Sequence, residues 1–527
     1  MVSTRGIGST RRTFLTVTGA AAALALAGNL PEIEPARAAA PSSGRPRDPF
    51  TLGVASGDPL PDAVVIWTRL APRPLERFGG MDYRPVPVQW QVAEDERFSR
   101  IVKEGVAEAR PEASHAVHVD VRGLRPWREY WYRFRAHGQL SPVGRTKTAP
   151  APDAAIPELS LAFASCQAWW EGWYTAHADL AARQHDLVVF LGDYIYEFGI
   201  DRGVRPHSGE DYVTRETVTL DEYRNRYASY RMDPDLQAAH ASAPWVVTMD
   251  DHEVINNWAD EAHPSAPPAQ FLVRRANAFR AYWEHMPLRA AQQPQGPDLQ
   301  LYRRFRYGKL AEFSVLDTRQ YRSDQAYGDG SKPPGPETKD PARTLTGDAQ
   351  EKWLLDGWAA SRSRWNVLAQ QNALARLDVQ DGAGVVVPMD TWDGYEASRS
   401  RVLGGARDRN VRNLVSIGGD LHRSVASDLR LDFDDPDSPA VGTEFVGTSI
   451  SSGLDGMDLD PGGATLLKEN PHIKYCNFQR GYVSCSVTPE RWISDFRVVD
   501  KVTVPNGTVS TRAKLLVEDG RPEIQTL

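Results

Sequence analysis

The sequence predicts an α/β protein of two main domains, a β-sandwich followed by a larger domain of layered strands and helices. Its 527 residues include 41% hydrophobic and 25% charged residues, the balance of a globular protein. Residues 49–148 consist of short β-rich runs separated by Gly, Pro and Asp. From residue 158 onward, strand-like runs alternate with helix-like stretches. That alternation is typical of a layered α/β domain.

Residues 1–39 have the features of an export signal and are set apart from the fold. Arg11 and Arg12 precede an apolar run from Phe14 to Gly28, and Ala36-Arg37-Ala38 follows. This pattern predicts a twin-arginine (Tat) signal peptide, and therefore a secreted or extracytoplasmic protein exported folded. The alternative, a membrane anchor, is disfavoured because the run has only 15 residues, whereas a spanning helix needs about 20. We expect no transmembrane segment.

Charge and cysteine content exclude several classes of protein. The chain has 61 basic and 69 acidic residues, for a net charge of −8, which argues against nucleic acid as the main partner. Three cysteines are too few for a disulfide framework. Cys476 and Cys485 lie nine positions apart in a predicted strand–turn–strand stretch. The sequence leaves two alternatives open for this pair, a disulfide or two unlinked buried thiols.

The N-terminal domain, residues 49–148, resembles immunoglobulin- and fibronectin-like domains. Within residues 128–136, strand alternation places Tyr130, Tyr132 and Phe134 on one face. Leu124-Arg125-Pro126 before Tyr130 resembles the strand-entry corner of those domains. The region contains no cluster of catalytic residue types, so we expect a structural role.

A Pro/Ala-rich linker leads to the larger domain, predicted over residues 158–505. Residues 506–527 are polar and turn-rich and are predicted to be a C-terminal tail, in which no lid over the site can be placed. We expect Thr346 to cap the last of the helices. The predicted strands are Leu159–Ala164, Asp186–Leu191, Trp245–Met249, Ala311–Leu316, Trp365–Ala369 and Asn413–Ile417, and the predicted helices are 172–184, 221–231, 270–285 and 346–361.

Chemically active side chains follow four of these strands directly. In layered α/β proteins, the carboxyl ends of neighbouring strands form the usual ligand crevice, so we expect these side chains to meet. They are Cys166; Asp193 and Tyr196; Asp250, Asp251, His252 and Glu253, with Asn256 and Asn257 close behind; and Asp420 and His422.

So many carboxylates in one buried place require neutralisation by cations. Like charges at close range drive one another toward protonation, and desolvating them is costly. Taken singly, these residues have ordinary explanations: Asp193 as a turn cap, Tyr196 as core packing and Cys166 as a small buried apolar residue. Together, their carboxylate, imidazole, thiolate and phenolate groups predict a site for two or more metal ions.

At this point the chain resembles a known family, the PhoD-type alkaline phosphatases of the calcineurin-like metallophosphoesterase superfamily. The resemblance implies a catalytic domain built as a β-sandwich flanked by helices. It extends over nearly everything after the signal and rests on the motifs FTLGVASGDPLPDAVVIWTRL, FASCQ, FLGDYIYE, DDHEVINN, AFRAYWEHMPLR, LDTRQYR, GDAQEKWL, WDGY, GGDLH and FVGTSISSG.

The resemblance also implies a metal cluster, with Fe³⁺ held by Cys166, Asp193 and Tyr196. Asp193 would bridge to neighbouring Ca²⁺ ions, and zinc or manganese in place of these metals stays open. The remaining implied ligands are Asp251, Asp420, His422 and Asn257, with Asn256 as the alternative to Asn257.

Three more residues are candidates for substrate contact. His252 is predicted to bind phosphate or to protonate the leaving group. Arg289 and Arg319 are predicted to contact phosphate, with structural ion pairs as the equal alternative. In this interpretation His252, Asp251 and Arg289 are the catalytic residues.

The implied reaction is hydrolysis of phosphomonoesters, and of some phosphodiesters, at alkaline pH by metal-activated attack on phosphorus. The alternative is a calcium-dependent phosphodiesterase similar to phospholipase D, with phospholipids among its substrates. A non-catalytic adhesive protein is a third hypothesis, which does not explain the converging ligands. The sequence contains no G-x-S-x-G elbow and no P-loop, and it gives no indication of oligomeric state.

Overall fold

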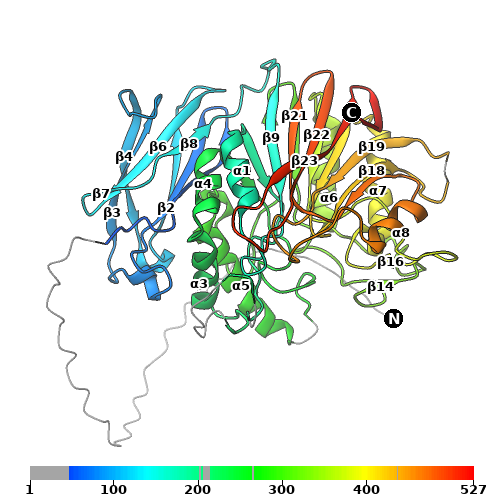
Figure 1. The fold of residues 1–527 in the computed structure, drawn as a ribbon, viewed down its shortest axis with the longest axis horizontal. Coiled ribbons are helices and arrows are strands. Elements are labelled where there is room, and N and C mark those ends of the chain that lie inside the picture. The colour runs from blue at the N-terminus through cyan, green and yellow to red at the C-terminus, as the bar shows by residue number, and fades with distance from the viewer. Residues whose placement is uncertain (1–46, 201–202, 206–213, 264–265, 436) are drawn as a thin grey trace, which may run out of the picture. The chain divides into compact units, whose positions relative to one another are not determined.

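Two large stacked β-sheets form the centre of the computed structural model, which describes residues 47–200, 203–205, 214–263, 266–435 and 437–527 (Figure 1). The predicted signal peptide, residues 1–39, lies outside the described residues. Within the described part of the chain, no helix combines the length and apolar character needed to cross a membrane.

The first sheet has ten strands. In spatial order they are β24 (Arg521–Thr526), β23 (Val509–Glu518), β22 (Arg491–Val499), β21 (Arg480–Val487), β9 (Leu159–Ala164), β10 (Leu187–Phe190), β11 (Pro244–Val247), β1 (Val54–Leu60), β2 (Ala63–Arg69) and β5 (Ala116–Arg122). Strands β9, β10 and β11 are parallel to one another. Because both faces of these three strands are covered, each is a short apolar run, interrupted in β9 by Ser160 alone.

The second large sheet has seven strands and smaller sheets complete the β structure. The seven are β12 (Arg303–Tyr307), β13 (Ala311–Val315), β15 (Trp365–Ala369), β17 (Leu414–Gly418), β19 (Ala440–Val446), β18 (Ser424–Arg430) and β20 (Ile473–Asn477). The smaller sheets comprise β4 (Ile101–Ala109), β3 (Val86–Ala93), β6 (Glu129–Ala136), β7 (Gln139–Leu140) and β8 (Gly144–Lys147), and the pair β14 (Ser331–Lys332) and β16 (Val387–Pro388).

Helices cover the outer faces of the two large sheets. The α-helices are α1 (Thr175–Arg183), α3 (Leu220–Arg231), α4 (Pro234–Ser242), α5 (Pro268–His285), α6 (Gly347–Ala360), α7 (Glu396–Asp408) and α8 (Pro461–Glu469). Short 3₁₀ turns are η1 (Arg77–Gly80), η2 (Pro111–Ala113), η3 (Ala290–Gln292) and η4 (Trp392–Tyr395).

Alternating side chains of the central strands divide the core into layers. In β9, Leu161 and Phe163 pack between the two sheets against residues such as Phe313 and Ile417. The intervening side chains of β9–β11 face α1, α3, α4 and α5. A further cluster joins the second sheet to α6 and α7. This confirms the predicted β-sandwich flanked by helices.

The N-terminal region is also a sandwich, and it shares one of its sheets with the larger region. Side chains of β1, β2 and β5 pack against those of β3 and β6, including Tyr130, Tyr132 and Phe134 as the alternation predicts. Strand β1 then pairs in parallel with β11, so the first sheet continues from one region into the other.

The structure corrects several local predictions. Residues 509–526 form β23 and β24 rather than a polar tail, because Leu515 and Val517 alternate into the core between the sheets. Thr346 makes no capping bond with its side chain, and the Thr344 hydroxyl accepts from the Gly347 amide instead. Cys166, Cys476 and Cys485 are all free and buried, so the second and third form no disulfide.

Candidate metal centre

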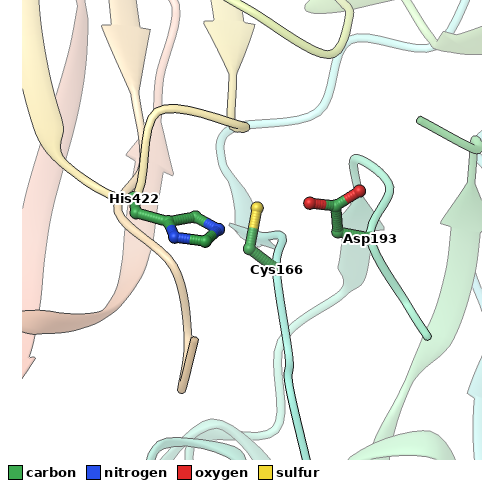
Figure 2. Close-up of side chains that lie close together, drawn as sticks. All are labelled: Cys166, Asp193 and His422. Carbon is green, nitrogen blue, oxygen red and sulfur yellow. The ribbon is translucent and has the colours of Figure 1, made fainter. Parts of the chain in front are cut away.

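Strand ends from both large sheets deliver the predicted ligands to one place. Cys166 follows β9, Asp193 follows β10, and His422 follows β17 of the second sheet. Figure 2 shows the Cys166 sulfur, the His422 imidazole and the Asp193 carboxylate turned toward a common space. Their ligand atoms all lie within 4.8 Å of one another, and all three side chains are buried or half-buried. The prediction that distant strand ends converge is confirmed.

Tyr196 joins the same group through its hydroxyl. That oxygen donates to Asp193 over 2.9 Å and lies 3.0 Å from His422 Nε2. It also accepts a hydrogen bond from Ser452 over 2.9 Å. The phenol oxygen is therefore fixed between a carboxylate and an imidazole of the cluster.

Asp193 belongs to every cluster of potential ligands in the described residues. Besides the group with Cys166 and His422, its carboxylate lies within 4.8 Å of ligand atoms of Asp251 and His252, and of a set containing Asp250, Asp251 and Asp420. One carboxylate has two oxygens and can bind two cations. The geometry therefore agrees with Asp193 as a bridging ligand.

Left-handed backbone turns place these ligands directly after their strands. The φ angles of Cys166, Asp193, Asp420 and His422 are +60°, +55°, +64° and +50°. Non-glycine residues adopt such angles at a cost of the order of 1 kcal/mol or more, and they concentrate at functional sites. The turns reverse the chain at the sheet edge, so that short side chains reach one point.

Glu253 holds two of these turns together. One of its carboxylate oxygens accepts from the amide of Asp193 over 3.1 Å and of Asp250 over 2.8 Å, and the other accepts from the amide of Tyr194 over 2.6 Å. Burial raises the pKa of Glu253 to about 7, although these backbone donors oppose the rise. Glu253 is an organiser of the site rather than a ligand.

Without bound cations, the buried carboxylates of the cluster repel one another, and their ionised forms are disfavoured. Burial raises the pKa of Asp193 and Asp420 well above the ordinary range, and the neighbouring aspartates raise it further. Burial likewise raises the pKa of Asp250 to about 6. Burial also raises the pKa of the Cys166 thiol and the Tyr196 phenol, with Asp193 adding to both.

Several buried oxygens of the cluster lack hydrogen-bond donors. Asp193 Oδ1, Asp250 Oδ2 and Asp251 Oδ1 have no hydrogen-bond partner among the described residues. An unsatisfied buried carboxylate oxygen is costly unless it is bonded or coordinates a cation. Thiolate, phenolate, imidazole and carboxylate donors together fit metal ions. The residues present therefore fit a metal centre.

Arg319 is brought to the cluster, where it forms ion pairs. Its guanidinium is fully buried, donates to Asp250 over 2.5 Å and to Asp390 over 2.8 Å, and lies 3.6 Å from Asp251. Burial would raise the pKa of Asp251, but Arg319 and then His252 outweigh it and hold that pKa below the ordinary range. These contacts match the structural alternative for Arg319.

Arg289 forms the ion pairs of its structural alternative, whereas Asn257 contacts a residue of the cluster. The Arg289 guanidinium pairs with Asp120 of β5 and donates to the Asp58 carbonyl over 2.6 Å, so it is engaged with the N-terminal region. Asn257 donates its backbone amide to Asp251 over 2.7 Å and its side-chain amide to Asp329 over 2.8 Å. Asn257 thus supports Asp251, and its amide oxygen as a metal ligand stays a prediction.

His252 is held beside the cluster by the residues that follow Asp193. Its Nδ1 lies 2.7 Å from the buried Glu197 carboxylate, which also accepts from the Asn256 amide. The Tyr196 ring lies 4.3 Å from the imidazole. Burial would lower the pKa of His252, but Asp251 and Glu197 raise it well above the ordinary range.

The sequence assigned no individual role to Asp250, Glu197 or Glu253, and for Asp390 it left lining of the site entrance and turn capping open. Asp250 was visible in the DDHE run, but only the structure shows that it pairs with Arg319. Asp390 accepts from Arg319 and from Arg322, and so joins a loop of the second sheet to the cluster. No local pattern reports such pairings, because the partners lie dozens of residues apart.

The fold is that of metallophosphatases, and the cluster at its strand ends is a candidate metal centre. The same fold occurs in purple acid phosphatase PPD1 from yellow lupin (Lupinus luteus) seeds. That structure matches with a TM-score of 0.52 and 11% identity, covering 89% of this chain and 74% of that chain. At this identity the likeness concerns the fold alone.

The chain belongs to the PhoD-like phosphatase family, as its motifs predict. The family model matches residues 161–496, and the model of the PhoD-like phosphatase N-terminal domain matches residues 36–150. The chain is 51% identical over 472 residues to alkaline phosphatase D of Bacillus subtilis (strain 168), covering 89% of this chain and 81% of that protein. The solved structure of PhoD matches with a TM-score of 0.89 and 49% identity, over 92% of this chain and 93% of that chain.

Proposed function

We propose that this phosphatase hydrolyses phosphomonoesters at alkaline pH with Fe³⁺ and Ca²⁺ bound at the cluster. The observation that carries the proposal is the buried Asp193 carboxylate, which belongs to all three groups of converging ligands. Family membership supplies the reaction class. Cys166, Asp193, Tyr196 and His422 would hold the iron. Asp251 and Asp420, with Asn257, would hold calcium.

Bound metals supply charge neutralisation at the phosphoryl oxygens and an activated nucleophile. The side chains do the positioning. Glu197 and Tyr196 fix the imidazole of His252, which contacts the phosphoryl group or gives a proton to the leaving oxygen. Arg319 holds Asp250 and Asp390 in place. The reaction then depends on positioning and charge stabilisation, as phosphoryl transfer does generally.

Metal analysis and kinetics on one purified sample test this proposal. We expect about one equivalent of iron together with calcium by elemental analysis, and hydrolysis of 4-nitrophenyl phosphate that a chelator abolishes. Zinc or manganese in place of iron would keep the chemistry and reject the ferric assignment. Much faster turnover of bis-4-nitrophenyl phosphate or phosphatidylcholine would favour the diesterase alternative.

The ferric assignment has a separate optical test. A phenolate bound to iron absorbs visible light, so Tyr196→Phe should lose that band. Tyr194→Phe is the matched control, because Tyr194 is equally buried but its hydroxyl lies 2.9 Å from His240 rather than at the cluster. An unchanged band in Tyr196→Phe would exclude Tyr196 as the ligand.

We also propose export through the Tat pathway, on the basis of Arg11 and Arg12 and the apolar run behind them. Changing both arginines to lysine keeps the charge and should retain the protein in the cytoplasm with its signal attached. Processing that proceeds as in the unchanged chain would contradict the proposal. The measurement is cell fractionation followed by mass determination of the product.

A further inference from the structure

Phe198 is an exposed aromatic side chain beside the cluster. The residues before it, from Leu191 to Glu197, are buried, whereas Phe198 is 43% exposed. Its ring lies 5.0 Å from the His252 imidazole in an edge-to-face arrangement and 6.4 Å from the Tyr196 ring. An exposed aromatic ring thus borders a side chain that would touch the reacting ester.

We propose that Phe198 forms a leaving-group subsite, which selects phosphate esters whose alcohol carries an aromatic or other flat apolar group. The inference rests on the proposed phosphatase function and on His252 facing the leaving group. Because Nδ1 of His252 is occupied by Glu197, the ring nitrogen left for the substrate is Nε2. The Phe198 ring borders the same imidazole, so in this proposal a leaving group at Nε2 of His252 lies within reach of the ring.

The backbone under Phe198 is held in place, so the ring position is preorganised. The Phe198 carbonyl accepts from Arg226 over 2.7 Å, and the same guanidinium nitrogen donates to the Tyr196 carbonyl. Arg226 lies on α3 and is buried. A ring with few rotamers on a fixed backbone loses little entropy when it stacks on a ligand.

A second exposed apolar side chain follows another residue of the cluster. Ser452 donates to the Tyr196 hydroxyl, and two residues later Leu454 is 46% exposed. Arg480 donates to the Leu454 carbonyl over 2.9 Å and to the His422 carbonyl over 2.6 Å. Two segments that contribute to the cluster therefore each carry an exposed apolar side chain, Phe198 and Leu454. This surface favours an apolar leaving group over a strongly polar one.

The alternative role for Phe198 is purely structural, as a shield that keeps His252 in position. The two roles differ in kinetics. Loss of a shield would lower kcat for every ester alike, because the same imidazole serves each of them. Loss of a leaving-group subsite would raise KM only for esters whose alcohol reaches the ring.

The experiment compares phenyl phosphate and 1-naphthyl phosphate with glycerol 2-phosphate in the metal-loaded enzyme. For Phe198→Ala we expect KM for the two aryl esters to rise about three- to tenfold, the size expected for one aromatic contact. KM for glycerol 2-phosphate and inhibition by inorganic phosphate should change less than about twofold, since neither ligand reaches the ring. Phe198→Tyr should keep the aryl preference.

Tyr83→Ala is the matched control, because Tyr83 is an exposed aromatic residue that packs on Phe78 in the N-terminal region. Tyr83→Ala should leave KM and kcat for all three esters unchanged. Equal shifts for aryl and glyceryl esters in Phe198→Ala, or a common fall in kcat, would overturn the inference while the phosphatase function stands. Absence of hydrolysis of all three esters by the metal-loaded unchanged enzyme would overturn the proposed function, and the inference with it.

Discussion

Asp193 is the single residue on which the site most depends. It bears a raised pKa because it is buried and because aspartates surround it, and one of its oxygens lacks a donor. Such a residue destabilises the protein without metal and stabilises it with metal. The same side chain therefore has opposite effects on stability in the two states.

Asp193→Asn should separate those two effects. We expect activity to fall at least about 100-fold and bound metal to be lost, because an amide carries no charge to bridge two cations. The metal-free variant should be at least as stable as metal-free wild type, since one buried like charge has been removed. Elemental analysis and urea unfolding, with and without chelator, measure both.

Asp428→Asn is the control, a buried aspartate on β18 that accepts from the Ile524 amide away from the cluster. It should keep its metal and its activity. An Asp193→Asn protein with full metal content and wild-type turnover would contradict the assignment of this residue.

At the scale of elements, close turns after strands bring the ligands together. Gly192 lies between β10 and Asp193 with φ of +106°, and a Cβ there would lie 2.5 Å from the Asp250 backbone nitrogen. A side chain at this position would push the ends of β10 and β11 apart. Helix α3 supports the next residues, since its Tyr230 hydroxyl accepts from the Tyr196 amide.

Gly192→Ala should therefore disrupt the centre. We expect a loss of unfolding free energy at least about 2 kcal/mol greater than for Gly138→Ala, together with loss of bound metal. Gly138 is a suitable comparison because its φ is also positive, +78°, but nothing lies within 4 Å of its added Cβ. Equal unfolding curves for the two variants would show that the close approach to Asp250 does not matter.

The N-terminus of α3 provides a second test at this scale. Thr219 and Glu222 form a capping box, in which the threonine hydroxyl accepts from the Glu222 amide and the carboxylate accepts from the Thr219 amide. Thr219→Ala should lower the unfolding free energy by about 1 kcal/mol. Val218→Ala, at the exposed residue just before the cap, should change it much less. Denaturant unfolding measures both, and equal losses would exclude the cap as the cause.

At the scale of the whole molecule, stability depends on how the separate core layers of the two sheets, the helices and the N-terminal sandwich are joined. Strand β1 joins the N-terminal region to β11, whose carboxyl end leads to Asp250. Buried polar groups tie the layers together. Glu444 of β19 is one of them, since it accepts from the amides of Leu374 and Ala375.

Glu444 gives stability a pH dependence with a defined sign. Burial raises its pKa from 4.5 to about 7 in the folded protein. Between these values the folded chain keeps a proton that the unfolded chain releases. The contribution of Glu444 to the free energy of unfolding is therefore fully present below pH 4.5. It falls by up to about 3 kcal/mol as the pH rises toward 7.

Glu444→Gln should remove this contribution, because glutamine does not titrate. The difference in unfolding free energy between variant and wild type should shift in favour of the variant by about 3 kcal/mol between pH 4.5 and 7. Urea unfolding of both proteins across that range measures it. Parallel pH profiles would show that Glu444 titrates normally.

The amino-acid sequence was sufficient to predict the central strands, four of the helices and which side chains meet at the strand ends. Local patterns carry this information because burial on both faces makes β9, β10 and β11 almost entirely apolar, and because the candidate ligands follow their strands directly. The prediction for residues 506–527 was wrong because the alternation in β23 is short and its outer face is polar.

The folded structure was needed to show which charged residues contact the cluster and which form ion pairs elsewhere. The sequence predicted phosphate contact for both Arg319 and Arg289, but Arg319 is buried against Asp250, whereas Arg289 pairs with Asp120. The pairing of Glu197 with His252 was likewise invisible, because 55 residues separate them. A side chain's type is local information, whereas its charge partner depends on which strands meet, and that is a property of the folded chain.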